Sequence, residues 1–316
     1  MKKHDLNSVA RQIAETYCRT GKYLKAEQSV LHTMKYRDSE RGGAILLGES
    51  GIGKTTFAKT FLSQHAEASL SEHDNKFGIY VEVPGGNLKV LYGQILQELG
   101  DIAPEKGTAA DKKTRIIKLI NEMDVKVVFV DEVQEVLPST KLLPTSAFVK
   151  DFKEIANNTN CAWILCGTPN AMAIKDVDKQ LASRLPKTIL LPVFSFKTQE
   201  DKLEYLEFLF EFFEHLPVAA PYFKCLNESI TDEGFSYFCN VNYDNLLRML
   251  LATDGCLRPF MTLMQDCLDR LEDGEKITKS TLVEAYDECF EGEELNPFSA
   301  SISKVKKLLI QRGLYA

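Results

Sequence analysis

The sequence has no CxxC pair, no histidine spacing typical of a zinc site, and no apolar run near the ~20 residues that span a membrane. Its start, MKKHDLNSVARQ, carries two lysines without a following apolar block, which argues against a secretory signal and predicts a cytoplasmic location. Buried free thiols are favoured over disulfides or metal binding for the eight scattered cysteines: Cys18, Cys161, Cys166, Cys225, Cys239, Cys256, Cys267 and Cys289.

An excess of positive charge is also missing. The formal net charge is −7, so the composition does not indicate bulk affinity of a monomer for nucleic acid. A local basic strip repeated around an oligomer would still bind a phosphate backbone. Internal repeats and low-complexity runs are absent from the sequence. With 316 residues, 44% of them hydrophobic, the chain is long enough for a packed core domain and a smaller second one.

Five apolar runs predict β-strands, and helical patterns separate them. Near-continuous apolar runs such as VKVVFVDE are typical of strands that a parallel sheet buries on both faces. Strands alternating with helices predict a parallel α/β sheet. The predicted strands lie within ERGGAILLGES (40–50) and at 77–83, 125–132, 162–168 and 188–194.

Helical patterns dominate both sides of this predicted core. Residues 1–30 are expected to form a helical extension, 31–195 the core, and 196–290 a small all-α domain whose first helix Thr198 caps. The last segment, 291–316, mixes basic and apolar residues and is expected to be a tail outside the core. It either docks on a partner protein or packs on the helical domain.

The stretch LLGESGIGKTTF contains GxxxxGK[ST] in full, between a predicted strand and a predicted helix. Glycines let backbone N–H groups approach phosphates closely, and a helix N-terminus favours negative charge. In this arrangement Lys54 reaches the β- and γ-phosphates, and the Thr55 hydroxyl ligates Mg²⁺. The stretch predicts a site for ATP and Mg²⁺ formed by Gly48, Glu49, Ser50, Gly51, Ile52, Gly53, Lys54, Thr55 and Thr56.

Two later strand ends add polar groups. VVFVDE places Asp131 to hold Mg²⁺ directly or through water, and Glu132 to polarise the water that attacks the γ-phosphate. CGTPN ends the next strand. There, either Thr168 or Asn170 contacts the γ-phosphate or the attacking water, or the segment is an ordinary turn, since Gly, Pro and Asn are turn residues anyway.

The order GESGIGKTT, VVFVDE, ILCGTPN and QLASRLP, followed by helices, resembles an AAA+ ATPase over about residues 30–290. The resemblance implies that Arg184 of QLASRLP reaches the γ-phosphate of the neighbouring subunit, a role that suits a planar and permanently charged guanidinium. The alternative is a surface arginine or one paired with a core carboxylate. Arg258 of GCLRPF either contacts the nucleotide of its own subunit or lies on a helix surface.

GTPNA, followed closely by QLASR and an LPVF segment, is similar to the TniB/TnsC family of AAA+ regulators of DNA transposition. The resemblance implies head-to-tail rings or filaments of ATP-bound subunits around duplex DNA. These would link a TniQ-like target-selection protein, with or without a CRISPR guide complex, to the transposase. Slow ATP hydrolysis would disassemble them. A helicase loader or replication initiator is the alternative, as is a STAND-type signalling ATPase, which would be expected to carry repeats.

DNA contacts in such an assembly are expected from loops and helices that face a central channel. Basic residues near the second strand, around a polar loop expected at 102–113, and after the VVFVDE strand are the candidates. A single lysine is more often a solvated surface charge, so only repetition around an assembly would make such contacts effective. The candidates are Lys89, Lys112, Lys113, Arg115, Lys150 and Lys153.

Overall fold

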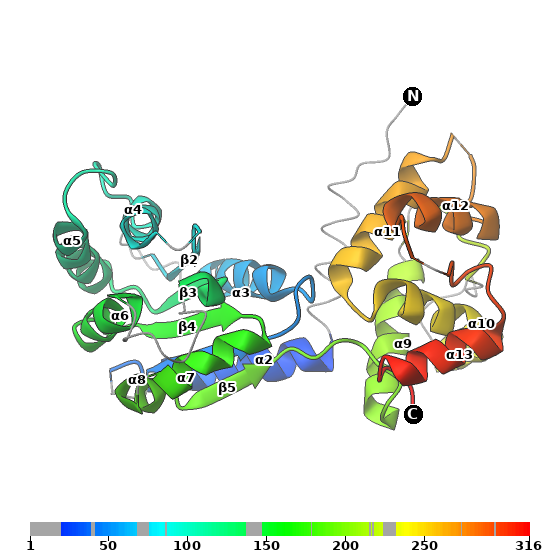
Figure 1. Ribbon diagram of the computed structural model, residues 1–316, viewed down its shortest axis with the longest axis horizontal. Coiled ribbons are helices and arrows are strands. Elements are labelled where there is room, and N and C mark those ends of the chain that lie inside the picture. Colours follow the sequence, from blue (N-terminus) through cyan, green and yellow to red (C-terminus); the bar gives the residue numbers. More distant parts are fainter. Residues whose placement is uncertain are drawn as a thin grey trace. The chain divides into compact units, whose positions relative to one another are not determined.

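The computed structural model of the chain divides into two compact units (Figure 1). The sheet unit holds residues 24–50 and 54–191, and the helical unit holds 20–23, 51–53 and 192–316. The residues that the structure describes are 20–38, 42–67, 76–85, 87–136, 147–177, 179–214, 216, 218–223, 232–272, 274–293 and 295–316.

A five-stranded parallel sheet forms the centre of the sheet unit, as predicted. Its strands follow the order β2-β3-β4-β1-β5. Every residue of β1, β3 and β4 is buried, because helices cover both faces of these central strands. The strands are β1 (Gly43–Leu47), β2 (Gly78–Glu82), β3 (Val127–Asp131), β4 (Ala162–Gly167) and β5 (Lys187–Leu190).

The prediction of a fifth strand over 188–194 is wrong beyond Leu190. The N–H of Leu191 still donates to the carbonyl oxygen of Leu47 at 2.8 Å. The next residue, Pro192, has no N–H and cannot continue a ladder. The N–H of Phe194 then donates to Gly255 in the helical unit, at 2.9 Å.

Helices and short 3₁₀ turns connect the strands. The loop expected at 102–113 is wrong in its second half, because α5 already begins at Ala109. Thr108 and Asp111 form a capping box there, which satisfies two N–H groups at the helix start. The connecting elements are α2 (Gly21–Met34), α3 (Lys54–Glu67), α4 (Leu88–Glu98), α5 (Ala109–Glu122), η1 (Val133–Val136), α6 (Ala147–Asn157), η2 (Pro169–Ala173), α7 (Ile174–Val177) and α8 (Lys179–Arg184).

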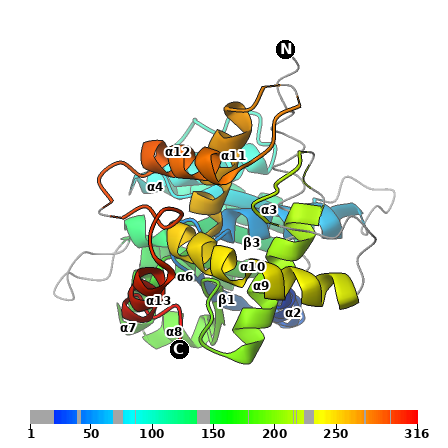
Figure 2. The same ribbon diagram turned by 90° about the vertical axis from the view of Figure 1, so that its right-hand side faces the viewer.

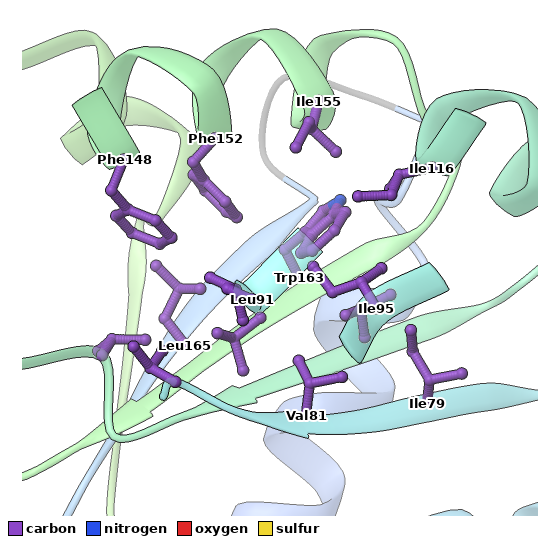
Figure 3. Close-up of a cluster of buried hydrophobic side chains, with 14 of the residues drawn as sticks. Ile79, Val81, Leu91, Ile95, Ile116, Phe148, Phe152, Ile155, Trp163 and Leu165 are labelled. Carbon is purple, nitrogen blue, oxygen red and sulfur yellow. The ribbon is translucent and has the colours of Figure 1, made fainter. Parts of the chain in front are cut away.

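Alternate residues of each strand pack into different halves of the core. On one face, Trp163 of β4 meets Phe152 of α6 edge to face, with ring centroids 5.3 Å apart, in a cluster that includes side chains from α4 and α5 (Figure 3). On the other face, Phe129 of β3 packs against Phe57 and Phe61 of α3. This period of two holds the sheet between two helical layers and fixes which strand ends carry polar side chains.

Five described helices form most of the helical unit (Figures 1 and 2). The predicted cap is confirmed, since the N–H of Asp201 donates to the Thr198 hydroxyl at 3.0 Å. The helices are α9 (Gln199–Glu214), α10 (Asp232–Thr253), α11 (Leu257–Asp269), α12 (Lys279–Cys289) and α13 (Ile302–Gln311).

The last segment belongs to this unit, so the expectation of a tail outside the core is wrong. Phe298, Val305 and Leu309 are fully buried. The guanidinium of Arg248 in α10 donates to the carbonyl oxygens of Pro297 and Ala300 at 2.5 and 2.6 Å. Of the two alternatives, the structure shows packing on the helical unit.

The structure bears on two expectations drawn from the composition, those on membrane-spanning segments and on the cysteines. No helix in the described ranges is long and apolar enough to cross a membrane. Six of the cysteines are free thiols, and Cys161, Cys166 and Cys267 among them are buried. Cys18 and Cys225 lie outside the described residues.

Lys22 is a buried amine, and we expect Lys22→Met to raise the melting temperature. Burial lowers the Lys22 pKa from about 10.5 to about 7, although Glu204 opposes the shift. Unfolded chains therefore hold a proton between pH 7 and 10.5 that folded chains have lost, so wild-type stability rises with pH across this window. A change of one pKa unit corresponds to about 1.4 kcal/mol. The stability that Lys22→Met gains over the wild type is therefore largest at or below pH 7.

Calorimetry at pH 7 and pH 9.5 tests this expectation. The difference in melting temperature between Lys22→Met and wild type should shrink at the higher pH. Lys35→Met, which removes an exposed lysine next to the end of the same helix, serves as the control and should show no such pH dependence. An equal gain at both pH values would contradict the assigned burial cost.

Candidate nucleotide-binding site

Polar groups gather at the carboxyl edge of the sheet. Strands β1 and β4 end side by side, with Leu47 beside Gly167, and Asp131 ends β3 next to β4. The GxxxxGK[ST] segment, residues 48–55, is the P-loop of this chain. Its first residue continues the strand pairing, because the N–H of Gly48 donates to the Gly167 carbonyl oxygen at 3.2 Å. Three segments distant in sequence therefore meet where a parallel sheet commonly binds its ligand.

The P-loop turns on glycines that no other residue readily replaces. Gly51 and Gly53 have φ values of 78° and 105°, in the region that L side chains avoid. Helix α3 begins at Lys54, so its free N–H groups point towards the loop. The buried Lys54 ammonium donates to the carbonyl oxygens of Gly48 and Glu49 at 2.9 and 3.0 Å. The amine is thus held within the loop that would receive phosphates.

Asp131 and Thr55 are neighbours, as their predicted roles at Mg²⁺ require. The Thr55 hydroxyl donates to Oδ2 of the buried Asp131 at 2.8 Å, and the N–H of Glu132 donates to Oδ1 at 2.9 Å. A hydroxyl and a carboxylate are the hard oxygen ligands that Mg²⁺ prefers. The donor set therefore fits Mg²⁺, with Asp131 and Thr55 as the residues that would hold it.

Tyr80 completes the surroundings of Asp131, and the sequence pattern did not reveal it. Its hydroxyl donates to Asp131 Oδ2 at 3.0 Å from the edge strand β2. Burial, and then the charge of Asp131, raise the Tyr80 pKa well above its usual range, so the phenol stays protonated and remains a donor. The only signal in the sequence was a tyrosine in a strand next to VVFVDE.

Glu132 has an unusual backbone and a second unexpected partner. Its φ of 57° is rare outside glycine and asparagine, and such outliers gather at functional sites. Its carboxylate accepts a hydrogen bond from the side-chain amide of Gln134. Gln134 in turn accepts from the N–H of Thr168 at 3.2 Å. Sequence reasoning named Glu132 and Thr168 but not the residue that joins them.

Thr168 and Asn170 lie at the predicted strand end. Thr168 precedes the 3₁₀ turn η2, and its side chain makes no capping hydrogen bond. Asn170 is exposed within that turn. A contact of either side chain with the γ-phosphate or the attacking water stays a prediction.

Arg184 lies at the opposite end of the sheet from its own P-loop. It is the last residue of α8, and its backbone lies against Gly43, the first residue of β1. If Gly43 carried a Cβ, that atom would be only 2.7 Å from the Arg184 carbonyl oxygen. The P-loop follows the other end of β1, so at roughly 3.3 Å per residue the five residues of that strand separate the two. Among described residues its guanidinium has no ion-pair or hydrogen-bond partner, which argues against pairing with a core carboxylate.

A family model described as Bacterial TniB protein matches residues 9–195, more than half of the chain. The chain belongs to the TniB family. No curated protein matches it at a significant level.

Solved structures share the fold of this TniB-family chain at low sequence identity. The Aeropyrum pernix ORC2 protein (ADPNP–ADP complexes) has a TM-score of 0.58 at 17% identity, with 83% of this chain and 66% of that chain covered. For Cdc6p from Pyrobaculum aerophilum the TM-score is 0.56 at 14% identity, covering 85% and 68%. For Drosophila ORC bound to DNA it is 0.55 at 12%, covering 92% and 67%. The chain thus has the AAA+ fold and spans about two thirds of these neighbours.

Arg258 is the second residue of α11, in the helical unit of the TniB-family protein. Its N–H donates to the carbonyl oxygen of Gly51, which belongs to the same unit, at 2.8 Å. A Cβ on Gly51 would lie 2.8 Å from that of Arg258, so this approach also requires glycine. The two predicted alternatives for the exposed Arg258 guanidinium stay open.

One proposed DNA contact is wrong in this structure, because Lys112 is fully buried. Its ammonium donates to the carbonyl oxygen of Lys89 at 3.2 Å and lies 3.6 Å from the carboxylate of Glu105. A phosphate backbone cannot reach an enclosed amine. The helix α5 places Lys112 inward, where the expected loop would have left it exposed.

Three further candidates for DNA contacts already form ion pairs or hydrogen bonds with other groups of the protein. Lys113 pairs with Asp151 and Glu154 at 3.3 and 2.6 Å, and its hydrogen bond with Glu154 raises its pKa. Arg115 donates to backbone carbonyl oxygens, and Lys153 donates to the side chain of Gln180 at 3.1 Å.

Lys89 and Lys150 are exposed and have no ion-pair partner within the described part of the chain. Among the candidates for DNA contacts, these two therefore carry charges that could meet a phosphate. Contact of either one with DNA stays a prediction.

Proposed function

We propose that this protein is an ATP-hydrolysing regulator of DNA transposition that assembles head to tail on duplex target DNA. The observation that carries the proposal is the placement of Arg184 and the P-loop at opposite ends of one sheet. An arginine on one face and a nucleotide site on another can complete each other only between subunits. Such a heterologous interface builds rings or filaments. Membership of the TniB family supports transposition as the context.

The side chains at the carboxyl edge of the sheet suit hydrolysis. Glu132 accepts a proton from water as the water oxygen bonds to the γ-phosphorus, and the bond from that phosphorus to the bridging oxygen breaks to leave ADP and phosphate. Lys54 stabilises charge on the phosphates, and Arg184 of the neighbouring subunit supplies charge in trans. Thr55 and Asp131 would hold Mg²⁺, which would supply positive charge to the phosphates.

Hydrolysis would act as a switch that releases the assembly. In the bound state the assembly would connect a TniQ-like target-selection protein, with or without a CRISPR guide complex, to the transposase. Lys89 and Lys150 would contribute phosphate contacts, which repetition around the assembly would multiply. Binding of this kind is sensitive to salt and poor at reading sequence.

Electron microscopy of the purified protein with duplex DNA tests the proposal. We expect rings or filaments on DNA with a non-hydrolysable ATP analogue, and bare DNA without nucleotide. Lys54→Ala, which removes the phosphate-binding amine, should behave like the nucleotide-free protein. Monomeric protein that leaves DNA bare under every condition would overturn the proposal and favour a helicase loader that acts on a protein ring.

A further inference from the structure

A single peptide group at the end of β4 joins the P-loop to the side chain of Gln134. Its carbonyl half, from Gly167, accepts from the N–H of Gly48 at 3.2 Å. Its N–H half, from Thr168, donates to Gln134 Oε1 at 3.2 Å. Because a backbone N–H can only donate, the atom that faces it must be the amide oxygen, and the amide nitrogen is left for the next contact.

The amide nitrogen of Gln134 donates to Oε2 of Glu132. Within the described part of the chain, the other oxygen of this carboxylate accepts no hydrogen bond. The contact therefore orients the carboxylate about its side chain and leaves one oxygen for a water molecule. A chain of hydrogen bonds runs from Gly48 through one peptide group and one amide to Glu132.

The packing around this chain is tight. A Cβ at residue 167 would lie 2.6 Å from Gln134 Oε1 and 2.7 Å from the Cβ of Ala171, so only glycine leaves room for the amide. Glu132 itself has a φ of 57°, a costly conformation that persists only when surrounding contacts determine it. These features fix the positions of both side chains.

We propose that Gln134 is a positioning residue for hydrolysis, which holds the Glu132 carboxylate towards the attacking water. The Gly167–Thr168 peptide group couples this orientation to the P-loop, so that a shift of Gly48 on nucleotide binding changes the support of Glu132. This inference rests on the proposed ATPase function. Gln134 acts through Glu132 and not on the nucleotide itself.

Steady-state hydrolysis of ATP by the full-length protein with duplex DNA tests the inference. For Gln134→Ala we expect kcat to fall by about 10²-fold, since small misplacements of a catalytic group cost this much. The KM for ATP and the melting temperature should change little. Gln97→Ala, at an exposed glutamine of α4, is the matched control and should retain wild-type kinetics.

A second variant separates the lost hydrogen bond from lost packing. Gln134→Glu keeps the volume and the acceptor for Thr168 but removes the donor to Glu132, so a similar fall in kcat is expected. It also serves as the test if Gln134→Ala does not fold. Wild-type kcat in a folded Gln134→Glu protein, or an increase in KM that accounts for the whole loss, would overturn the inference.

A double-mutant cycle shows whether Gln134 works through Glu132. Combining Gln134→Ala with Glu132→Gln should give the residual rate of Glu132→Gln alone. Losses that multiply would instead assign Gln134 an independent structural role and refute positioning. A wild-type protein that hydrolyses no ATP would overturn the proposed function itself, which is a different outcome from an active wild type with an unaffected Gln134 variant.

Discussion

Replacement of Arg184 by alanine is expected to lower ATP hydrolysis in the presence of duplex DNA by about 10³-fold or more, the contribution that an arginine supplied by a neighbour makes to phosphoryl transfer. The physical reason is the location of Arg184 beside Gly43, at the end of the sheet opposite its own P-loop. ATP binding to the isolated subunit should persist, because the P-loop is unchanged. Hydrolysis and nucleotide binding measured in parallel give the two expected results.

Mixing experiments show whether Arg184 acts between subunits. Arg184→Ala subunits keep Glu132, whereas Glu132→Gln subunits keep Arg184. An interface that joins one of each regains a complete site, so an equimolar random mixture should recover on the order of one quarter of the wild-type rate. Two inactive variants that stay inactive when mixed would contradict a role in trans.

A control variant separates the proposed action of Arg184 in trans from a general charge effect. Lys179→Ala removes an exposed positive charge from the first residue of the same helix, α8. It should hydrolyse ATP at the wild-type rate. Arg184→Lys should remain strongly impaired, because an ammonium lacks the planar fork of the guanidinium.

Glu132→Gln should trap the ATP-bound assembly on DNA. The substitution keeps the size of the side chain but removes the group that accepts a proton from water, so hydrolysis should fall by about 10²- to 10⁴-fold. If hydrolysis releases the assembly, filaments or rings formed with ATP should persist after dilution. Light scattering and electron microscopy at successive times measure this persistence.

Glu135→Gln provides the matched control for this experiment. Glu135 is an exposed carboxylate in the 3₁₀ turn η1, three residues after Glu132. Its assemblies should dissociate at the wild-type rate. Glu132→Gln assemblies that dissociate equally fast, despite blocked hydrolysis, would show that ATP turnover is not the release step.

Much of the nucleotide site could be predicted because its signals are local. Glycines at 51 and 53 must adopt positive φ, and the helix that follows places Lys54 and Thr55 at its start. The carboxylate that ends an apolar strand reaches the same sheet edge by the geometry of parallel pairing, which brought Asp131 within 2.8 Å of the Thr55 hydroxyl.

Side-chain partners from other segments could not be predicted in the same way. Tyr80 and Gln134 each contact a carboxylate named from the sequence, yet neither belongs to a spaced motif. Lys112 illustrates the opposite error. The sequence suggests an exposed basic residue like its neighbours, but helix α5, which Thr108 caps, directs the Lys112 side chain into the protein interior.

Sequence patterns alone predict the P-loop, the parallel sheet, the helical unit after it and the carboxylate pair at the end of β3. Periodicity and glycine spacing depend on a few neighbouring residues, so they can be recognised in the amino-acid sequence. Three features are visible only in the folded chain: α13 packs on α10, Lys112 is enclosed, and Arg184 lies away from its own P-loop. These outcomes depend on contacts between segments tens to more than a hundred residues apart, which no local pattern encodes.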